Sequence, residues 1–105
     1  MKESVVQRWV RERLMSAFGH NIYIFKVPQG QYASRRGIPD LCCCINGRFV
    51  SIEVKTDVGT LTALQSNEIK NIKTAGGIAF TIFGKDDALL NEFIRSMNEH
   101  STEAS

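Results

Sequence analysis

Two apolar segments joined by Asn46-Gly47 constrain this chain more than any other feature. Asn and Gly both tolerate positive φ, and two-residue hairpin turns need that conformation at both central positions. The flanking segments, residues 40–45 and 48–55, are rich in apolar and β-branched residues, which favour strands. We therefore expect an antiparallel hairpin. Pro39 fits this arrangement, since proline suits the first position of a strand, where its missing N–H does least harm.

The second strand of this hairpin should have two different faces, because successive side chains of a strand point to opposite sides. One face carries the apolar side chains Val50, Ile52 and Val54. Glu53 and Lys55 project together from the other face, and Asp40 begins the first strand. These charges have a simple alternative explanation, as a strand-start acid and an exposed edge pair. We favour a cleft, because a following helix should cover part of that face and buried charges are costly.

Two carboxylates and a lysine at a sheet surface suit metal-assisted hydrolysis of phosphodiesters. Asp40 and Glu53 offer the oxygen ligands that hard cations such as Mg²⁺ prefer, and the carbonyl of Val54 is a further candidate ligand. Lys55 is a candidate to position or deprotonate an attacking water, or to offset charge developing on the phosphate.

The rest of the chain alternates between helical and strand-like patterns. Helical spacing of apolar residues, capping residues and β-branched runs predict a helix over residues 3–18, a strand over 22–27, a loop over 28–38, a helix over 62–75, a strand over 78–83 and a last helix beginning at Asp86 or Asp87. Residues 99–105 are small and polar and are expected to form a flexible C-terminal tail.

This order predicts an α/β fold with a mixed sheet flanked by helices on both faces. Residues 48–83 form a β-α-β unit, so their two strands should be parallel with a right-handed crossover. The first three strands are linked by turns or a loop and should be antiparallel. The 105 residues and 43% hydrophobic content fit one domain, which we place at residues 1–98.

The charge is unevenly distributed, although the net value is only +2. Residues 1–36 hold seven basic and two acidic residues, and the remainder holds six basic and nine acidic residues. A basic N-terminal third suggests an anionic partner contacted from one side; a solvated helix face is the alternative. No apolar run is long enough to cross a bilayer, so no membrane partner is expected.

The three cysteines are consecutive, Cys42-Cys43-Cys44. Neighbouring strand residues point to opposite faces and make poor disulfide partners. The chain also lacks the spaced second pair of a zinc site. We expect small, buried, reduced core residues, which fits a cytoplasmic protein.

Pro39-Asp40 followed by Glu53-Val54-Lys55 matches the PD-(D/E)xK signature of a large nuclease superfamily. The signature alone is degenerate. Its surroundings, Gly37-Ile38 before it and Thr56, Leu61-Thr62, Gln65 and Gly76-Gly77 after it, make the chain resemble a stand-alone member of the virus-type replication-repair nuclease (VRR-NUC) family. The resemblance covers the chain from Glu3 to about Phe83.

The resemblance implies a restriction-endonuclease-like α-β-β-β-α-β core and a set of site residues. Asp40 and Glu53 would bind Mg²⁺ or Mn²⁺, and Lys55 would be catalytic. Glu3 matches the acid on the first helix that completes the site, although an acid in a first helical turn also simply favours the helix dipole. Gln65 matches a glutamine of the family and would have a catalytic role, orienting a water or the lysine; a plain helix-surface position is the alternative. Stand-alone members resemble dimeric resolvases of four-way DNA junctions.

The loop before Asp40 supplies candidate DNA-binding residues. Arg35 and Arg36 have the forked geometry that suits phosphate oxygens; a solubilising loop is the alternative. Tyr32 would stack on an unpaired base, or else pack on the loop. Gln29 opens the same loop and is included with them.

These observations predict a Mg²⁺- or Mn²⁺-dependent, structure-selective DNA endonuclease. A homodimer is expected, because symmetric cutting of a four-way (Holliday) junction needs two active sites related by a two-fold axis. Two alternatives stay open: a nuclease of flaps, nicks or plain duplex, and a DNA-binding subunit without catalysis.

Overall fold

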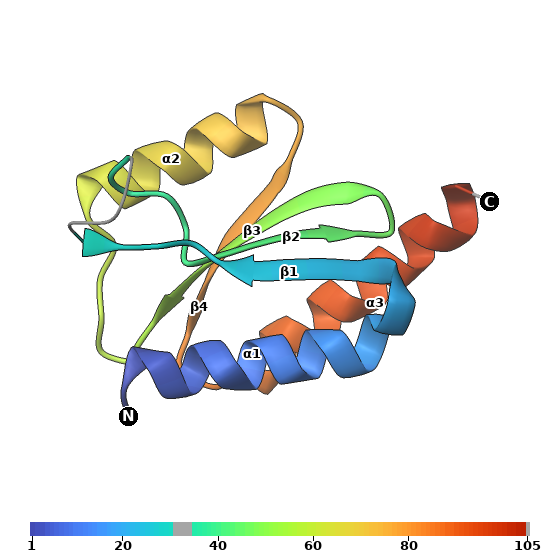
Figure 1. Ribbon diagram of the computed structural model, residues 1–105, viewed down its shortest axis with the longest axis horizontal. Helices are drawn as coiled ribbons and strands as arrows, with labels where there is room; N and C mark the ends of the chain where they lie inside the picture. The colour runs from blue at the N-terminus through green and yellow to red at the C-terminus, as the bar shows by residue number, and fades with distance from the viewer. Residues whose placement is uncertain (31–34, 105) are drawn as a thin grey trace.

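The computed structural model describes residues 1–30 and 35–104 (Figure 1). Along the chain, the elements are α1 (Glu3–Phe18), a short 3₁₀ helix (Gly19–Asn21), β1 (Ile22–Lys26), β2 (Leu41–Ile45), β3 (Arg48–Lys55), α2 (Ala63–Thr74), β4 (Ile78–Phe83) and α3 (Asp87–Ala104). This is the predicted order of helices and strands. α1, β3 and β4 have the predicted bounds, and β1, β2 and α2 differ from theirs by one residue at one or both ends.

The four strands form one mixed sheet in the order β1-β2-β3-β4. β1 pairs with β2 and β2 with β3 in antiparallel fashion, and β3 and β4 are parallel. The predicted hairpin is therefore confirmed, and so is the parallel pairing within the β-α-β unit. Asn46 and Gly47 both have positive φ, 51° and 80°, as a two-residue turn of this kind requires.

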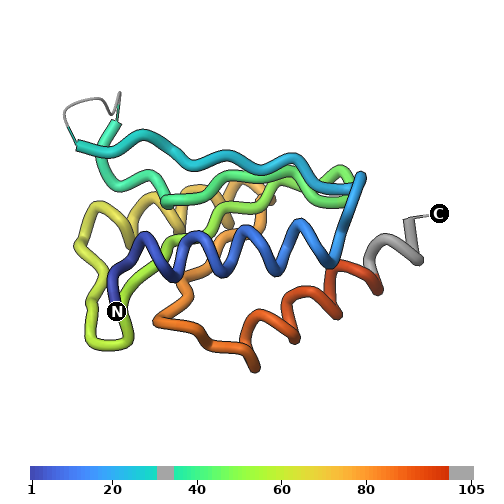
Figure 2. The backbone as a smooth tube through the Cα atoms, turned by 60° about the horizontal axis from the view of Figure 1, so that its bottom comes forward, coloured from blue at the N-terminus to red at the C-terminus, as the bar shows by residue number. Residues whose placement is uncertain are grey.

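Helices cover both faces of the sheet. Figure 1 shows α2 on one side and α1 and α3 on the other. Burial follows the predicted alternation: Val50, Ile52 and Val54 are fully buried in the core that α1 and α3 complete. α1 and α3 lie close together (Figure 2) and are linked by Arg13, which donates to Asp87 and to Asn91.

α2 begins with a reciprocal cap. Thr62 Oγ1 accepts from the backbone N–H of Gln65, and Gln65 Oε1 accepts from the N–H of Thr62. The loop that leads to Asp40 packs against this end of α2 at Gly37. Gly37 has a φ of 85°, and a Cβ there would lie 2.7 Å from the carbonyl oxygen of Leu64. Glycine is therefore required on both conformational and steric grounds.

Two expectations need correction. α3 continues to Ala104, although the helix was expected to give way to a tail at residue 99; Arg95 pairs with Glu99 one turn further on, which supports the longer helix. The flexibility of residues 99–105 stays a prediction. Of the three cysteines, which are all free, only Cys43 is buried, while Cys44 is exposed, because no helix covers that part of β2. No helix in the described part of the chain could span a membrane.

Candidate active site

Asp40 and Glu53 meet at one end of the β2–β3 hairpin. Leu41 of β2 lies opposite Ile52 of β3, which places the two acids side by side in the next register position. The backbone N–H of Asp40 donates to Glu53 Oε1 at 3.2 Å, and Asp40 Oδ2 accepts from the N–H of Val54 at 2.8 Å. Hydrogen bonds from both strands therefore fix the two carboxyl groups relative to each other.

The pair is buried: Glu53 is 1% exposed and Asp40 is 8% exposed. Loss of solvation is the main reason why the pKa of Glu53 rises to about 8; the hydrogen bond to the Asp40 carboxyl and its negative charge raise it further. The charge of Lys55 lowers the pKa and offsets part of this rise. A cation bound beside these two buried acids would stabilise their charged forms.

Lys55 completes a compact set of three charged groups. Its Nζ lies 3.9 Å from Glu53 Oε2, and its side chain is only 12% exposed. Glu53 and Lys55 project from the same face of β3 because they are two residues apart. This is the predicted arrangement. It places the positive charge of a largely buried lysine side chain next to the acid pair.

Glu3 lies near this set without joining it. It lines a cavity of about 490 Å³ together with Asp40, and the rest of the lining comes from Gln7, Lys26, Val27, Pro28 and Gln29. Among residues 1–30 and 35–104, no three His, Cys, Asp or Glu side chains are close enough to hold a metal ion together. Asp40 and Glu53 supply hard oxygen donors of the kind that suit Mg²⁺ or Mn²⁺. The roles of Glu3 and of the Val54 carbonyl as ligands stay predictions.

Comparisons with known proteins identify the fold. No protein-family model and no curated protein matches the chain. Among solved structures, a VRR_NUC domain is similar, with a TM-score of 0.70, 24% identity, and coverage of 89% of this chain and 94% of that one. The chain has the VRR_NUC fold. A second similar structure is Hjc of Archaeoglobus fulgidus, a Holliday junction resolvase, with a TM-score of 0.58, 16% identity, and coverage of 77% of this chain and 67% of that one.

In this VRR_NUC fold, Gln65 has a structural role that the sequence did not reveal. Its side-chain oxygen accepts from Thr62 and so closes the cap of α2. Arg35 is held in a comparable way, since its guanidinium donates to Glu68 of α2 at 2.7 Å. A catalytic role for Gln65 and a phosphate-binding role for Arg35 stay predictions.

The other candidate DNA-binding residues differ in position. Arg36 is exposed. Gln29 lines the cavity beside Asp40 and donates to the carbonyl oxygen of Ile38 at 3.4 Å. Tyr32 lies outside the described residues. Among the described residues of this loop, Gln29 is the predicted DNA-binding side chain that lies beside Asp40.

Sequence reasoning missed two residues of the VRR_NUC fold that line the cavity beside Asp40. Gln7 is 8% exposed although it is polar, and it lies one helical turn after Glu3, a spacing that would have placed both on one face. Lys26 pairs with Leu41, the neighbour of Asp40. Its position depends on the pairing register of β1 with β2, which could not be predicted from the sequence.

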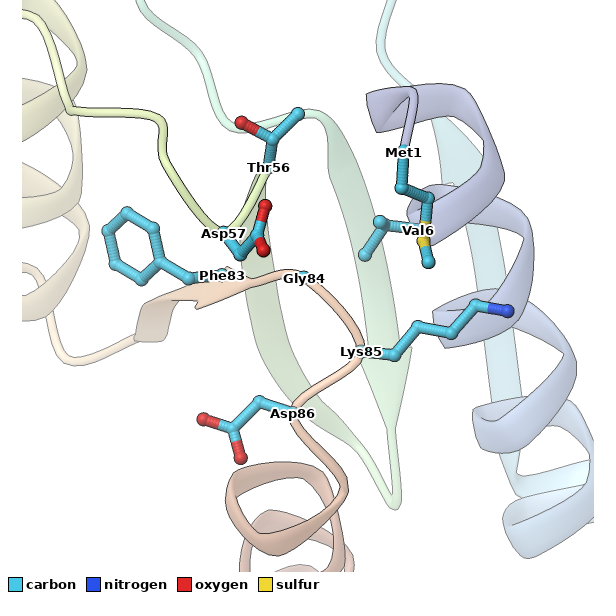
Figure 3. Close-up of a pocket in the computed structure, with 8 residues that line it drawn as sticks. All are labelled: Met1, Val6, Thr56, Asp57, Phe83, Gly84, Lys85 and Asp86. Atoms are coloured by element: carbon cyan, nitrogen blue, oxygen red, sulfur yellow. The ribbon is translucent and has the colours of Figure 1, made fainter.

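A second cavity, of about 550 Å³, lies near the carboxyl ends of β3 and β4 (Figure 3). Its lining comes from Met1 and Val6 at the start of the chain, from Thr56 and Asp57 after β3, and from Phe83, Gly84, Lys85 and Asp86 after β4. Asp40, Glu53 and Lys55 do not line it. Asp40 lines instead the cavity of Glu3 and Gln7.

Proposed function

We propose that this protein is a metal-dependent DNA endonuclease. The buried Asp40–Glu53 pair, with Lys55 Nζ 3.9 Å from Glu53, is the observation that carries the proposal. A structural protein gains nothing from two buried acids that repel each other, so a chemical purpose explains the arrangement best. The similarity in fold to a VRR_NUC domain and to a junction resolvase supports the same chemistry.

Each of the three residues has a distinct task in this proposal. Asp40 and Glu53 would hold Mg²⁺ or Mn²⁺, which when bound polarises a phosphoryl oxygen and lowers the pKa of water. Asp40 is itself oriented by the Val54 N–H, so its free oxygen is directed with little loss of side-chain entropy. Lys55 would hold the attacking water in line with the scissile bond or offset the charge that develops on the phosphate.

We infer a four-way DNA junction as the substrate and a homodimer as the active form. The described residues of one chain hold one such acid pair, and symmetric cutting of two strands needs two sites related by a two-fold axis. Resemblance in fold to the archaeal junction resolvase supports this choice. Tyr23, Phe25 and Phe49 offer a surface for the second copy: they are 72%, 45% and 49% exposed and lie on the α2 side of the sheet, in the part that α2 itself leaves uncovered.

A non-catalytic DNA-binding subunit is the second candidate. One observation favours it: the described residues hold an acid pair but no cluster of three metal-binding side chains. Cleavage activity separates the two candidates, because both predict DNA binding and only one predicts hydrolysis.

The test is cleavage of a labelled four-way junction, with matched flap and plain duplex, in Mg²⁺, Mn²⁺ or EDTA. The parent should cut the junction in paired, symmetric positions only when metal is present. Asp40→Asn and Lys55→Ala should each lower the rate by on the order of 100-fold or more while retaining DNA binding in EDTA. Glu92→Gln, which changes an exposed carboxylate of α3 outside the acid pair, is the matched control and should cut like the parent.

Three results would redirect the proposal. Cutting of flap or duplex but not junction would retain the nuclease and reject the resolvase. Equal cutting in EDTA would reject metal dependence. Binding without cutting of any substrate in either metal would favour the non-catalytic subunit.

A further inference from the structure

A third, smaller cavity adjoins the one beside Asp40. It measures about 200 Å³ and is lined by Ser4, Gln7, Arg8, Arg11 and Lys26. Gln7 and Lys26 line both cavities. The two cavities therefore form one groove between α1 and β1, which begins at Asp40 and continues past Arg8 to Arg11; we call it the α1–β1 groove.

Charge changes sign along this groove. Its first part carries the acids Glu3 and Asp40, where cleavage is proposed. Its second part carries Arg8, Arg11 and Lys26 and no acid. All three basic residues are exposed, and none of them forms an ion pair with an acid of the described residues. By contrast, Arg13 on the same helix pairs with Asp87 of α3. The cations of the groove are therefore available to an external anion.

The spacing of these cations suits the sugar-phosphate backbone of a nucleic acid strand. Arg8 and Arg11 lie on one stripe of α1, about 4.5 Å apart along the helix axis at 1.5 Å per residue. Phosphates of one DNA strand follow at about 3.4 Å along the duplex axis. Lys26 faces them from β1, since Lys26 and Gln7 line both cavities. Cations on two sides of a groove contact a backbone that runs along it, whereas a single bound ion would need them to converge.

We propose that the α1–β1 groove binds the phosphate backbone of the DNA strand on one side of the scissile bond, through Arg8, Arg11 and Lys26. The assignment of the bound strand as DNA rests on the proposed function. It assigns the basic N-terminal part of the chain to one binding surface, and it places the recognition of the backbone chiefly on α1 rather than on the loop that carries Arg35.

The test measures binding apart from cleavage. Anisotropy of a fluorescent four-way junction in EDTA, titrated between 50 and 200 mM salt, gives both affinity and its salt dependence. For Arg8→Gln/Arg11→Gln we expect binding weakened on the order of 10-fold at about 100 mM salt, and a log–log salt slope reduced by about 2. Adding Lys26→Gln should weaken binding further. Arginine and glutamine have similar helix propensities, so α1 should persist; circular dichroism checks this.

The matched control is Lys70→Gln/Lys73→Gln, which removes two exposed charges from α2 on the opposite side of the sheet. It should change affinity less than about 2-fold. Equal weakening by both double variants would show a general charge effect and overturn the groove. If an RNA duplex displaces the fluorescent junction as effectively as a DNA duplex does, the assignment to DNA is overturned.

Cleavage by the same proteins separates this inference from the proposed function. If the parent cuts and the groove variants bind like the parent, the groove fails and the nuclease stands. If the parent never cuts but the groove variants lose binding, the nuclease fails and the groove stands.

Discussion

Glu53 shows how burial and a neighbouring acid together set the charge of one side chain. Its pKa rises to about 8 in the folded protein, whereas an unfolded chain releases this proton near the ordinary value of 4.5. Between these values the folded state binds more protons than the unfolded state. The stabilisation that the proton provides is therefore complete below about pH 4.5 and is lost as the pH rises through about 8.

We predict that Glu53→Gln removes a pH-dependent loss of stability. In EDTA, the free energy of unfolding of the parent should fall relative to that of Glu53→Gln between about pH 5 and pH 8. Urea denaturation at several pH values measures it. Glu92→Gln is the control, since Glu92 is an exposed residue of α3, and it should follow the parent. A constant difference between parent and Glu53→Gln would contradict the raised pKa.

At the scale of elements, the loop before β2 is fitted to the first turn of α2 through Gly37. We predict that Gly37→Ala destabilises the protein and disturbs the site, because the new Cβ would lie 2.7 Å from the Leu64 carbonyl oxygen at a φ of 85°. Gly47→Ala is the matched control: its φ is also positive, at 80°, and nothing lies within 4 Å of the added Cβ.

Thermal or urea unfolding of both variants separates the cost of backbone strain at positive φ from the cost of the steric clash with Leu64. Gly47→Ala should lose about 1–2 kcal/mol from the left-handed conformation alone, and Gly37→Ala should lose more. Gly37→Ala should also cut DNA more slowly than Gly47→Ala, since Asp40 follows only three residues later. Equal losses in stability would show that the loop moves away from α2 without cost.

For the whole molecule, the uncovered part of the sheet determines how copies associate. We predict that Tyr23→Thr/Phe25→Thr converts a dimer to a monomer, because both side chains belong to the proposed contact face and threonine retains strand propensity. Light scattering coupled to size exclusion measures the mass. Met15→Gln/Val58→Thr, which changes two exposed apolar residues elsewhere, should remain dimeric. A parent that is monomeric at every concentration would reject the dimer.

The sequence predicted features that depend on local chemistry and periodicity. The turn at Asn46-Gly47 and the alternation in β3 sufficed to bring Asp40 beside Glu53, because a two-residue turn fixes the register of the hairpin. The sequence did not predict side-chain partners that depend on how distant segments pack together. Gln65 caps α2 and Arg35 pairs with Glu68, and Cys44 is exposed because the helices leave that part of β2 uncovered. The α1–β1 groove was missed for the same reason, since it depends on how a helix packs beside a strand.

The β2–β3 hairpin carries the acid pair and the lysine within sixteen consecutive residues, from Asp40 to Lys55. The residues proposed to hold DNA come chiefly from a different segment, α1. In this proposal, bond breaking and binding of the DNA backbone are thus assigned to separate stretches of the chain. Changing Arg8 and Arg11 of α1 is therefore a direct route to alter the affinity for DNA while Glu3, the acid pair and Lys55 are left in place.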